Sequence, residues 1–174
     1  MVLSALTTRL LTSRDAAEWR KLRAEAVRLY PDAFLTTESE VMAESDTAVA
    51  TRLDGGGSYG LFHGEKLVGF ARMGQSRLAR TRHRGYIGGF YVRPDFQGTG
   101  AAQALMQGLI AACPDRGIWQ LELFVNAVNH RAIRFYQALG FQKEGHLPNA
   151  VTGPEGPVDD WFMVMDLRRI DRKR

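Results

Sequence analysis

Residues 88–113, GGFYVRPDFQGTGAAQALMQGLIAAC, decide how this chain folds. They begin with an apolar run typical of a strand, turn at Arg93–Phe96, and pass through a glycine-spaced segment into an alanine-rich helix. Glycines between a strand and a helix let the backbone approach a ligand closely. The first N–H groups of a helix have no partners within it and lie at its positive end. The stretch therefore predicts a turn that binds an anion, most often a phosphate group.

Two familiar phosphate-binding motifs do not match this turn. A Walker A loop needs a Lys-Ser or Lys-Thr pair, which the sequence lacks, and the dinucleotide fingerprint fails because Gln103 stands where its third glycine belongs. The pattern that does fit is Gln97-x-x-Gly100-x-Ala102, after a strand that ends in Val-Arg-Pro. It resembles the pyrophosphate loop of the GNAT superfamily of N-acetyltransferases, [Q/R]-x-x-G-x-[G/A]. A tight turn with no ligand is the alternative explanation.

A second stretch, Asn129–Phe141, is similar to another block of the same superfamily. It reads N-x-x-A-x-x-F-Y-x-x-x-G-F and follows a predicted strand at Ile118–Val125. Asn129 is a good N-cap and Gly140 suits the end of a helix, so a capped amphipathic helix would by itself explain the spacing. Two blocks, each after a strand and in the superfamily's order, are more specific than either alone.

The order of predicted elements indicates a mixed α/β fold of the α+β kind. A strand, a helix and a second strand around residues 86–125 imply a right-handed crossover and a parallel pair. The resemblance implies the GNAT fold: a central, mostly antiparallel twisted sheet with flanking helices, in the order β-α-α-β-β-β-α-β-α-β-β, with strands 4 and 5 parallel. The predicted strands lie in residues 1–11 and at Tyr59–His63, Lys66–Met73, Tyr86–Val92, Ile118–Val125, Phe141–His146 and Asp160–Leu167.

Turn residues and helical spacing define the connections. A first helix opens at the capping-box-like Thr12-x-x-Asp15 and ends before Pro31, and a second opens at Thr37 and runs to the glycines at 55–57. Gly64-Glu65 suits a type II′ hairpin, Gly88-Gly89 suggests a bulge or close backbone approach, and Leu147–Val158 is expected to be a loop. The first helix is predicted to bury one stripe: Trp19, Leu22, Ala26 and Leu29.

Length and composition are those of one ordinary globular domain. At 174 residues the chain predicts a single N-acetyltransferase domain over 1–174, with a frayed charged tail at 168–174. The net charge of +4 is too small to indicate nucleic-acid binding. Cys113, the single cysteine, suits a reducing compartment, and no membrane span or export leader is evident, so a cytoplasmic location without membrane contact is expected. The four histidines lack metal-ligand spacing, so no metal is expected.

The resemblance implies acetyl-CoA as the co-substrate and places its contacts. Backbone N–H groups at the end of the central strand would pair with the pantetheine amides and the thioester oxygen, and those of the turn would hold the pyrophosphate. Side chains of the second block would touch the pantetheine arm. The implied coenzyme-binding residues are Phe90, Tyr91, Val92, Gln97, Gly98, Thr99, Gly100, Ala101, Ala102, Asn129 and Tyr136.

Two residues are candidates for acid–base catalysis. Tyr136 is predicted to be the general acid, because a phenol with a pKa of about 10 stays protonated at neutral pH and can protonate a departing thiolate. The alternative is an ordinary core tyrosine. Glu122 is either a base that acts through water or a structural carboxylate within the sheet, and the sequence leaves both open.

The implied activity is the transfer of an acetyl group from acetyl-CoA to a primary amine, by direct attack in a ternary complex. A non-catalytic acyl-CoA-binding module is the alternative. A nucleic-acid-binding protein that uses the basic loop at Gln75–Arg84 and the basic tail is the third hypothesis. The acceptor, a small molecule or a protein, would be shaped by Tyr30–Thr37 and His146–Asp160, which contain Asp32 and Asp159 beside Asp160. Edge pairing of the last strands would allow a homodimer.

Overall fold

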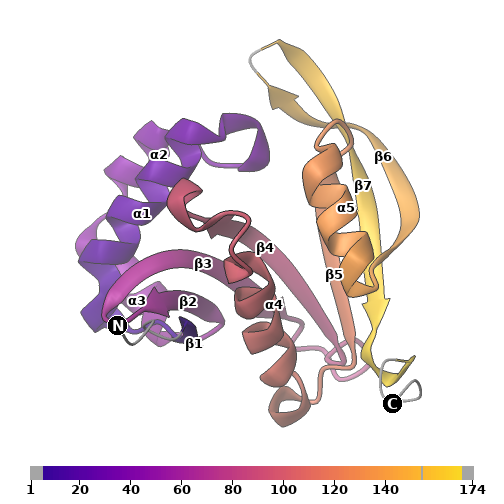
Figure 1. Ribbon diagram of the computed structural model, residues 1–174, viewed down its shortest axis with the longest axis horizontal. Coiled ribbons are helices and arrows are strands. Elements are labelled where there is room, and N and C mark those ends of the chain that lie inside the picture. Colours follow the sequence, from indigo (N-terminus) through magenta and orange to yellow (C-terminus); the bar gives the residue numbers. More distant parts are fainter. Residues whose placement is uncertain (1–5, 154, 170–174) are drawn as a thin grey trace. The chain divides into compact units, whose positions relative to one another are not determined.

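The computed structural model of the protein describes residues 6–153 and 155–169 (Figure 1). Parts of the predicted first strand, residues 1–5, and of the predicted frayed tail, residues 170–174, lie outside the described residues. The helices are α1 (Ala16–Leu29), α2 (Glu38–Ala43), α3 (Asp46–Asp54), α4 (Ala101–Ala111) and α5 (His130–Leu139). The strands are β1 (Leu6–Leu10), β2 (Ser58–His63), β3 (Lys66–Gln75), β4 (Arg84–Val92), β5 (Gln120–Asn126), β6 (Gln142–Gly153) and β7 (Gly156–Asp166).

The seven strands form one sheet in the order β1-β2-β3-β4-β5-β7-β6. β4 and β5 run parallel, while β1 with β2, β2 with β3, β5 with β7 and β6 with β7 are antiparallel. The parallel register joins only three residues of each strand, from Arg84 opposite Gln120 to Tyr86 opposite Glu122. The predicted mixed fold with one parallel pair between strands 4 and 5 is confirmed.

The described chain forms two compact units. The first unit comprises residues 6–73 and 89–112, and the second comprises 74–88 and 113–169. β4 contributes its first half to the second unit and its second half to the first, with the change at Gly88–Gly89. Both predicted motif blocks are therefore kept whole, one within each unit.

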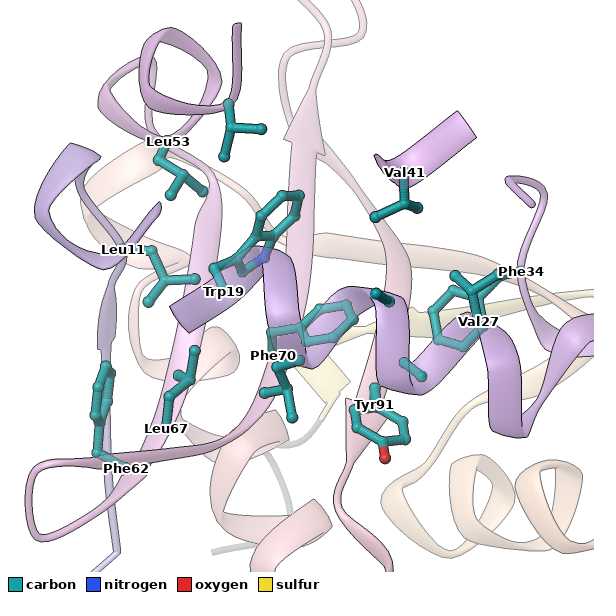
Figure 2. Packing of buried hydrophobic residues seen from close by; sticks show 14 residues of the cluster. Leu11, Trp19, Val27, Phe34, Val41, Leu53, Phe62, Leu67, Phe70 and Tyr91 are labelled. Carbon is teal, nitrogen blue, oxygen red and sulfur yellow. The ribbon is translucent and has the colours of Figure 1, made fainter. Parts of the chain in front are cut away.

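The core of the first unit gathers aromatic rings beside α1 (Figure 2). Trp19 of α1 meets Phe70 edge to face at 6.1 Å between ring centres, and Phe70 lies 5.7 Å from Tyr91 of β4. The predicted stripe is right for Trp19, Leu22 and Ala26 but wrong for Leu29, which is 48% exposed. Leu29 is the last residue of α1, and the cluster covers the middle of that helix rather than its end.

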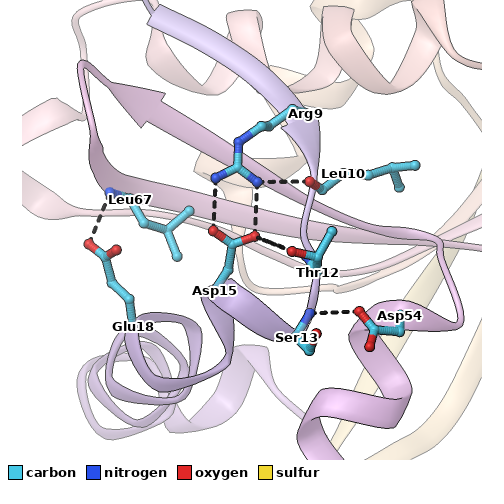
Figure 3. A network of polar contacts seen from close by, with 8 residues as sticks. All are labelled: Arg9, Leu10, Thr12, Ser13, Asp15, Glu18, Asp54 and Leu67. Atoms are coloured by element: carbon cyan, nitrogen blue, oxygen red, sulfur yellow. Dashed lines mark hydrogen bonds and ion pairs between the residues drawn. The ribbon is translucent and has the colours of Figure 1, made fainter.

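The predicted capping box before α1 is confirmed in a shortened form (Figure 3). The Thr12 N–H donates to Asp15 Oδ2 at 2.9 Å, within a 3₁₀ turn that precedes the α-helix. Arg9 Nη2 donates to the other carboxylate oxygen of Asp15 at 2.8 Å. The hydrogen bond from Arg9 lowers the pKa of Asp15, because it stabilises the charged carboxylate despite partial burial. This network fixes the entry into α1.

The predicted second helix is two helices. Thr37 caps α2, and its N–H donates to Glu40 Oε2 at 2.7 Å as the sequence pattern indicates. After Ala43 the backbone becomes extended, and Ser45 starts α3 by accepting the Ala48 N–H at 3.2 Å. A serine with its own cap bond competes with a continuous helix, which explains the break.

The expected loop at Leu147–Val158 is also mostly strand. β6 continues to Gly153 and β7 starts at Gly156, with Val151 opposite Val158. Pairing is interrupted between Leu147 and Val151, where Asn149 has a φ of +52°. β6 is the last strand of the sheet, and prolines are tolerated at edges and bulges, so Pro148 does not prevent strand structure here.

The other predicted connections agree with the structure. Gly64, with a φ of +61°, begins the two-residue hairpin that pairs His63 with Lys66. α4 buries Ala101, Leu105, Met106 and Leu109. It lies against β1, where Thr8 Oγ1 donates to the Ala104 carbonyl oxygen at 3.3 Å. Gly108 permits this approach, because a Cβ there would lie 2.4 Å from the Thr8 Cβ. The packing of α4 against β1 thus fixes the helix that the glycine turn precedes.

Candidate functional site

The turn before α4, in the first unit, leaves its backbone open. Gly98 and Gly100 have left-handed φ values of +78° and +87°, which glycine adopts without strain. A Cβ built on either residue would meet no atom within 4 Å. Gly100 is the N-cap of α4 and has no side chain to cap it. The two glycines therefore create a turn with room for a bound group.

Three N–H groups at the start of α4 remain available. The first bond of the helix runs from the Ala104 N–H to the Gly100 carbonyl oxygen at 2.9 Å. The N–H groups of Ala101, Ala102 and Gln103 meet no acceptor among residues 6–153 and 155–169. Unpaired N–H groups at the positive end of a helix of 11 residues suit an anion such as phosphate.

Side chains hold this turn in shape. Gln97 Nε2 donates to the Val92 carbonyl oxygen and to the Tyr30 hydroxyl, each at 3.1 Å. Thr99 Oγ1 donates to the Phe96 carbonyl oxygen at 2.7 Å. The glutamine of the motif therefore ties the turn to the end of β4, which gives its side chain a structural reason to be there.

The second half of β4, Phe90–Val92, is anchored by Tyr91. Its buried ring lies in the core, and its hydroxyl donates to Glu25 Oε1 at 2.8 Å, while Arg93 Nη2 donates to Glu25 Oε2 at 2.9 Å. Since the Tyr91 side chain is occupied, a coenzyme contact at this residue would have to use its backbone. Gly89, with a φ of +59°, gives β4 the irregular backbone that the paired glycines predict.

In the second unit, α5 carries the second motif block. Asn129 Oδ1 accepts the Ala132 N–H at 3.0 Å, and Gly140 ends the helix with a φ of +104°, so both predicted caps are confirmed. Tyr136 is 8% exposed and meets Phe141 at 5.6 Å between ring centres. Burial, with a smaller effect of Tyr86, raises the pKa of Tyr136 above its usual value. The phenol therefore stays protonated at neutral pH.

Glu122 is a buried, fully paired carboxylate. Arg84 Nη2 donates to Glu122 Oε2 at 2.7 Å, and Gln120 Nε2 donates to Oε1 at 2.7 Å. Burial would raise the pKa of Glu122, but the hydrogen bonds from Arg84 and Gln120 outweigh it and hold the pKa below its usual value. A carboxylate with a lowered pKa is a weak base, which favours the structural alternative for this residue.

The second unit also holds a pocket of about 470 Å³ that the sequence did not indicate. The Phe124 ring lies 6.4 Å from the Tyr86 ring and 5.1 Å from the Phe162 ring, between ring centres. These rings come from β4, β5 and β7, so no local pattern joins them; the only signal is that Phe124 shares a strand face with Glu122. The pocket is lined by Ser76, Thr81, Arg84, Tyr86, Glu122, Phe124 and Phe162.

The acidic residues expected to face an acceptor differ in their surroundings. Asp159 is engaged, because its Oδ2 lies 2.9 Å from His146 Nε2 and its Oδ1 accepts the Asn149 N–H at 2.8 Å. Burial, and then the charge of Asp159, raise the pKa of Asp160. Asp32 lies on an exposed 3₁₀ turn after α1.

Three further features concern the cysteine thiol, metal-binding clusters and membrane-spanning helices. Cys113 is buried, and burial raises the pKa of its thiol to about 11, so it is a poor nucleophile. Within the described ranges, no His, Cys, Asp and Glu side chains cluster in threes as a metal site would require. None of the helices there has the length and apolar character needed to cross a bilayer.

Comparison with known proteins identifies the family. Residues 19–141 match the model of the acetyltransferase (GNAT) family. An aminoglycoside N(6')-acetyltransferase type 1 from Stenotrophomonas maltophilia is 31% identical over 157 residues, 82% of this chain and 90% of that protein. A ribosomal protein bS18 alanine N-acetyltransferase from Escherichia coli is 34% identical over 76 residues, 44% of this chain and about half, 51%, of that protein.

A solved structure shows the same fold. The structure of yncA, a putative acetyltransferase from Salmonella typhimurium with its cofactor acetyl-CoA, has a TM-score of 0.79, with 94% of this chain and 95% of that chain covered at 20% identity. Three observations are consistent with this family: the sheet with its parallel β4–β5 pair, the two motif blocks and the matched family model. This chain belongs to the acetyltransferase (GNAT) family and is an acyltransferase.

Proposed function

We propose that this protein transfers the acetyl group of acetyl-CoA to a primary amine, by direct attack in a ternary complex. The observation that carries the proposal is the open turn before α4, where two left-handed glycines and three unpaired N–H groups leave space for a phosphate-bearing ligand. Membership of the family supports it, as does the solved relative from Salmonella typhimurium with acetyl-CoA.

In this proposal the main chain from Gln97 to Ala102 holds the pyrophosphate of the coenzyme. The fixed Gln97 side chain supports this role, because it keeps the turn in one conformation before a ligand arrives. Backbone N–H groups of Phe90–Val92 pair with the pantetheine amides and the thioester oxygen, and Asn129 touches the pantetheine arm. A donor to the thioester oxygen stabilises the charge that develops there during attack.

The chemical step needs one bond formed and one broken. The neutral amine nitrogen attacks the thioester carbon, the carbon–sulfur bond breaks, and the thiolate of coenzyme A departs. Tyr136 gives its phenolic proton to that sulfur and recovers a proton from the acylated amine through water, so that protons balance. Its buried, protonated phenol supports this assignment.

Glu122 has a secondary part in the proposal. Its bonds to Arg84 and Gln120 and its lowered pKa support a positioning role within the sheet, while water passes the amine proton to Tyr136. If Glu122 were the base instead, Glu122→Gln would lower turnover and remove one limb of the pH–rate profile. If Glu122 is a positioning residue, Glu122→Gln leaves the shape of the pH–rate profile unchanged.

The coenzyme site is tested by adding a side chain to the turn. Gly98→Asn places a polar group in the open space, and asparagine tolerates a positive φ better than other residues. We expect the Kd for acetyl-CoA, measured by calorimetry, to rise at least about tenfold, since direct phosphate contacts of this kind are charge-assisted hydrogen bonds. The matched control is Gly117→Asn, because Gly117 also has a positive φ, +64°, and open space around it. Equal affinity in both variants would overturn the proposed site.

Catalysis is tested separately at Tyr136. With purified protein and acetyl-CoA, thiol release is followed over a panel of amines that includes an aminoglycoside and an N-terminal peptide. Tyr136→Phe should lower kcat by about 100-fold while the Kd for acetyl-CoA stays within about threefold. Tyr59→Phe, another buried tyrosine, is the control. Unchanged turnover would remove Tyr136 from the mechanism, and coenzyme binding without any transfer would favour the binding module.

A further inference from the structure

Among the described residues, only one of three arginines of the first unit has a carboxylate partner. Arg23 lies on α1, Arg52 on α3 and Arg72 on β3. Arg52 is paired with Glu44, whereas Arg23 and Arg72 have no carboxylate oxygen within 4.0 Å in the part of the chain that the structure describes. Arginine stays protonated in proteins, so this group of side chains keeps an excess positive charge.

Arg23 is held firmly in this position. Its Nη2 donates to Thr36 Oγ1 at 2.9 Å, and its Cζ lies 5.4 Å from the centre of the Trp19 ring. Arg52 stacks near the same ring, with its Cζ at 5.5 Å. Burial, together with the charges of Arg52 and Arg72, lowers the pKa of Arg23, because each of them disfavours the charged guanidinium. A carboxylate partner would have the opposite effect and would stabilise the charged guanidinium.

The unused donors of Arg23 are open. A guanidinium has five N–H donors, and only the one to Thr36 finds an acceptor among the described residues. Among the described residues, Arg20 Nε is the only buried side-chain nitrogen or oxygen atom that lacks a hydrogen-bond partner. The unpaired nitrogen atoms of Arg23 are therefore not buried. Arg23 Nη1 faces Gly89, where a Cβ would stand only 3.6 Å away. The guanidinium of Arg23 therefore lies beside the backbone of β4 at Gly89.

The position of Arg23 relates it to the reaction. Gly89 directly precedes Phe90, the first of the strand residues proposed above to meet the pantetheine and the thioester. An anionic group bound at Arg23 would thus lie beside the segment where acetyl transfer is proposed. A planar carboxylate matches the fork of a guanidinium with two parallel hydrogen bonds.

We propose that Arg23 binds a carboxylate of the acceptor, so that the acceptor is an amino acid or another amine that carries a carboxylate close to its amino group. The proposal rests on the proposed function and narrows its acceptor. A polycationic aminoglycoside would be repelled by the same arginines, so the acceptor in the name of the Stenotrophomonas maltophilia relative is not expected here.

The test compares acceptors that differ only in the carboxylate. The twenty protein amino acids, each with its α-amide, and kanamycin are assayed by thiol release with acetyl-CoA. The carboxylate form of the best acceptor should have at least a tenfold higher kcat/KM than its amide. Arg23→Gln should lower that kcat/KM by about 10- to 100-fold, mainly through KM, because two charge-assisted bonds are lost. For the amide the change should stay within about threefold, and Arg23→Lys should recover part of the loss.

The control is Lys21→Gln, which removes a charge from the exposed face of the same helix and should leave all values unchanged. Calorimetry with the same amino acids and amides, and with acetyl-CoA, provides a readout without turnover. Arg23-dependent binding of the carboxylates without any transfer would keep this inference and overturn the proposed function. Transfer that is indifferent to the carboxylate, or an Arg23→Gln variant that loses acetyl-CoA affinity instead, would overturn the inference, the latter by assigning Arg23 to a coenzyme phosphate.

Discussion

Arg23 and Arg84 are both arginines, but among the described residues Arg84 has a carboxylate partner and Arg23 has none. Arg84, in the second unit, donates from Nη2 to Glu122 Oε2 at 2.7 Å, and the Glu122 side chain is only 6% exposed. Arg23, in the first unit, is half-buried with a threonine hydroxyl and an aromatic ring as its neighbours. A cation that the fold neutralises serves the fold, whereas a cation held without a counter-ion is available to a ligand. The contrast assigns structure to Arg84 and binding to Arg23.

The sharpest way to break this contrast is to remove the counter-ion of Arg84. Glu122→Gln leaves Arg84 without its charge partner, so we expect the free energy of unfolding to fall by about 2 kcal/mol, between the values for buried and exposed ion pairs because Arg84 is half-exposed. Urea unfolding measures the loss, and the midpoint temperature should fall by about 4–8 °C.

A double-mutant cycle supplies the control for this prediction. Arg84→Gln combined with Glu122→Gln removes both charges, and the pair should recover at least half of the stability lost by Glu122→Gln alone. Simple additivity of the two single substitutions would show that Arg84 and Glu122 do not stabilise one another, and the contrast with Arg23 would disappear.

The pH dependence of unfolding tests the same comparison, because the Glu122 carboxylate becomes protonated in acid whereas the Arg23 guanidinium stays charged. The pKa of Glu122 is lower in the folded protein than its value of 4.5 in the unfolded chain. Its contribution to stability is therefore fully present above pH 4.5 and is lost as the pH falls through the folded pKa. Between pH 5 and pH 3 the wild type should lose more stability than Glu122→Gln does, as measured by urea unfolding. Parallel curves for the two proteins would contradict the assignment.

The smallest expected effect on stability is that of Arg23→Gln. Loss of the contact with the Trp19 ring costs about 0.5–1 kcal/mol, and relief of the repulsion by Arg52 and Arg72 offsets it. We expect the free energy of unfolding to change by less than about 1 kcal/mol, within the usual range for sites without a buried partner. Thermal unfolding checks this, and a loss as large as that of Glu122→Gln would make Arg23 a structural residue.

Local patterns predicted those features of the fold that depend on neighbouring residues. The glycines at 98 and 100, the Asn129 cap and the Gly140 terminus are signals within a single turn, and each was found as expected. Predictions failed where the structure depends on more than the local pattern of one turn or cap. Ser45 divides the second helix, and Pro148 lies within strand structure only because β6 is an edge strand with interrupted pairing. Leu29 looked buried by spacing, although the core does not extend to the end of α1.

The sequence by itself determined the order of the strands along the chain, the glycine turn before α4 and the capped helix that carries Tyr136, because glycines, caps and periodic apolar residues act over a few residues. Only the tertiary structure decided which charges are satisfied. Arg84 meets Glu122 across 38 residues of sequence, and Arg23 of α1 lies beside Gly89 of β4. Pairing of charges depends on distances in space that no spacing along the chain encodes, so the candidate for acceptor binding emerged only from the fold.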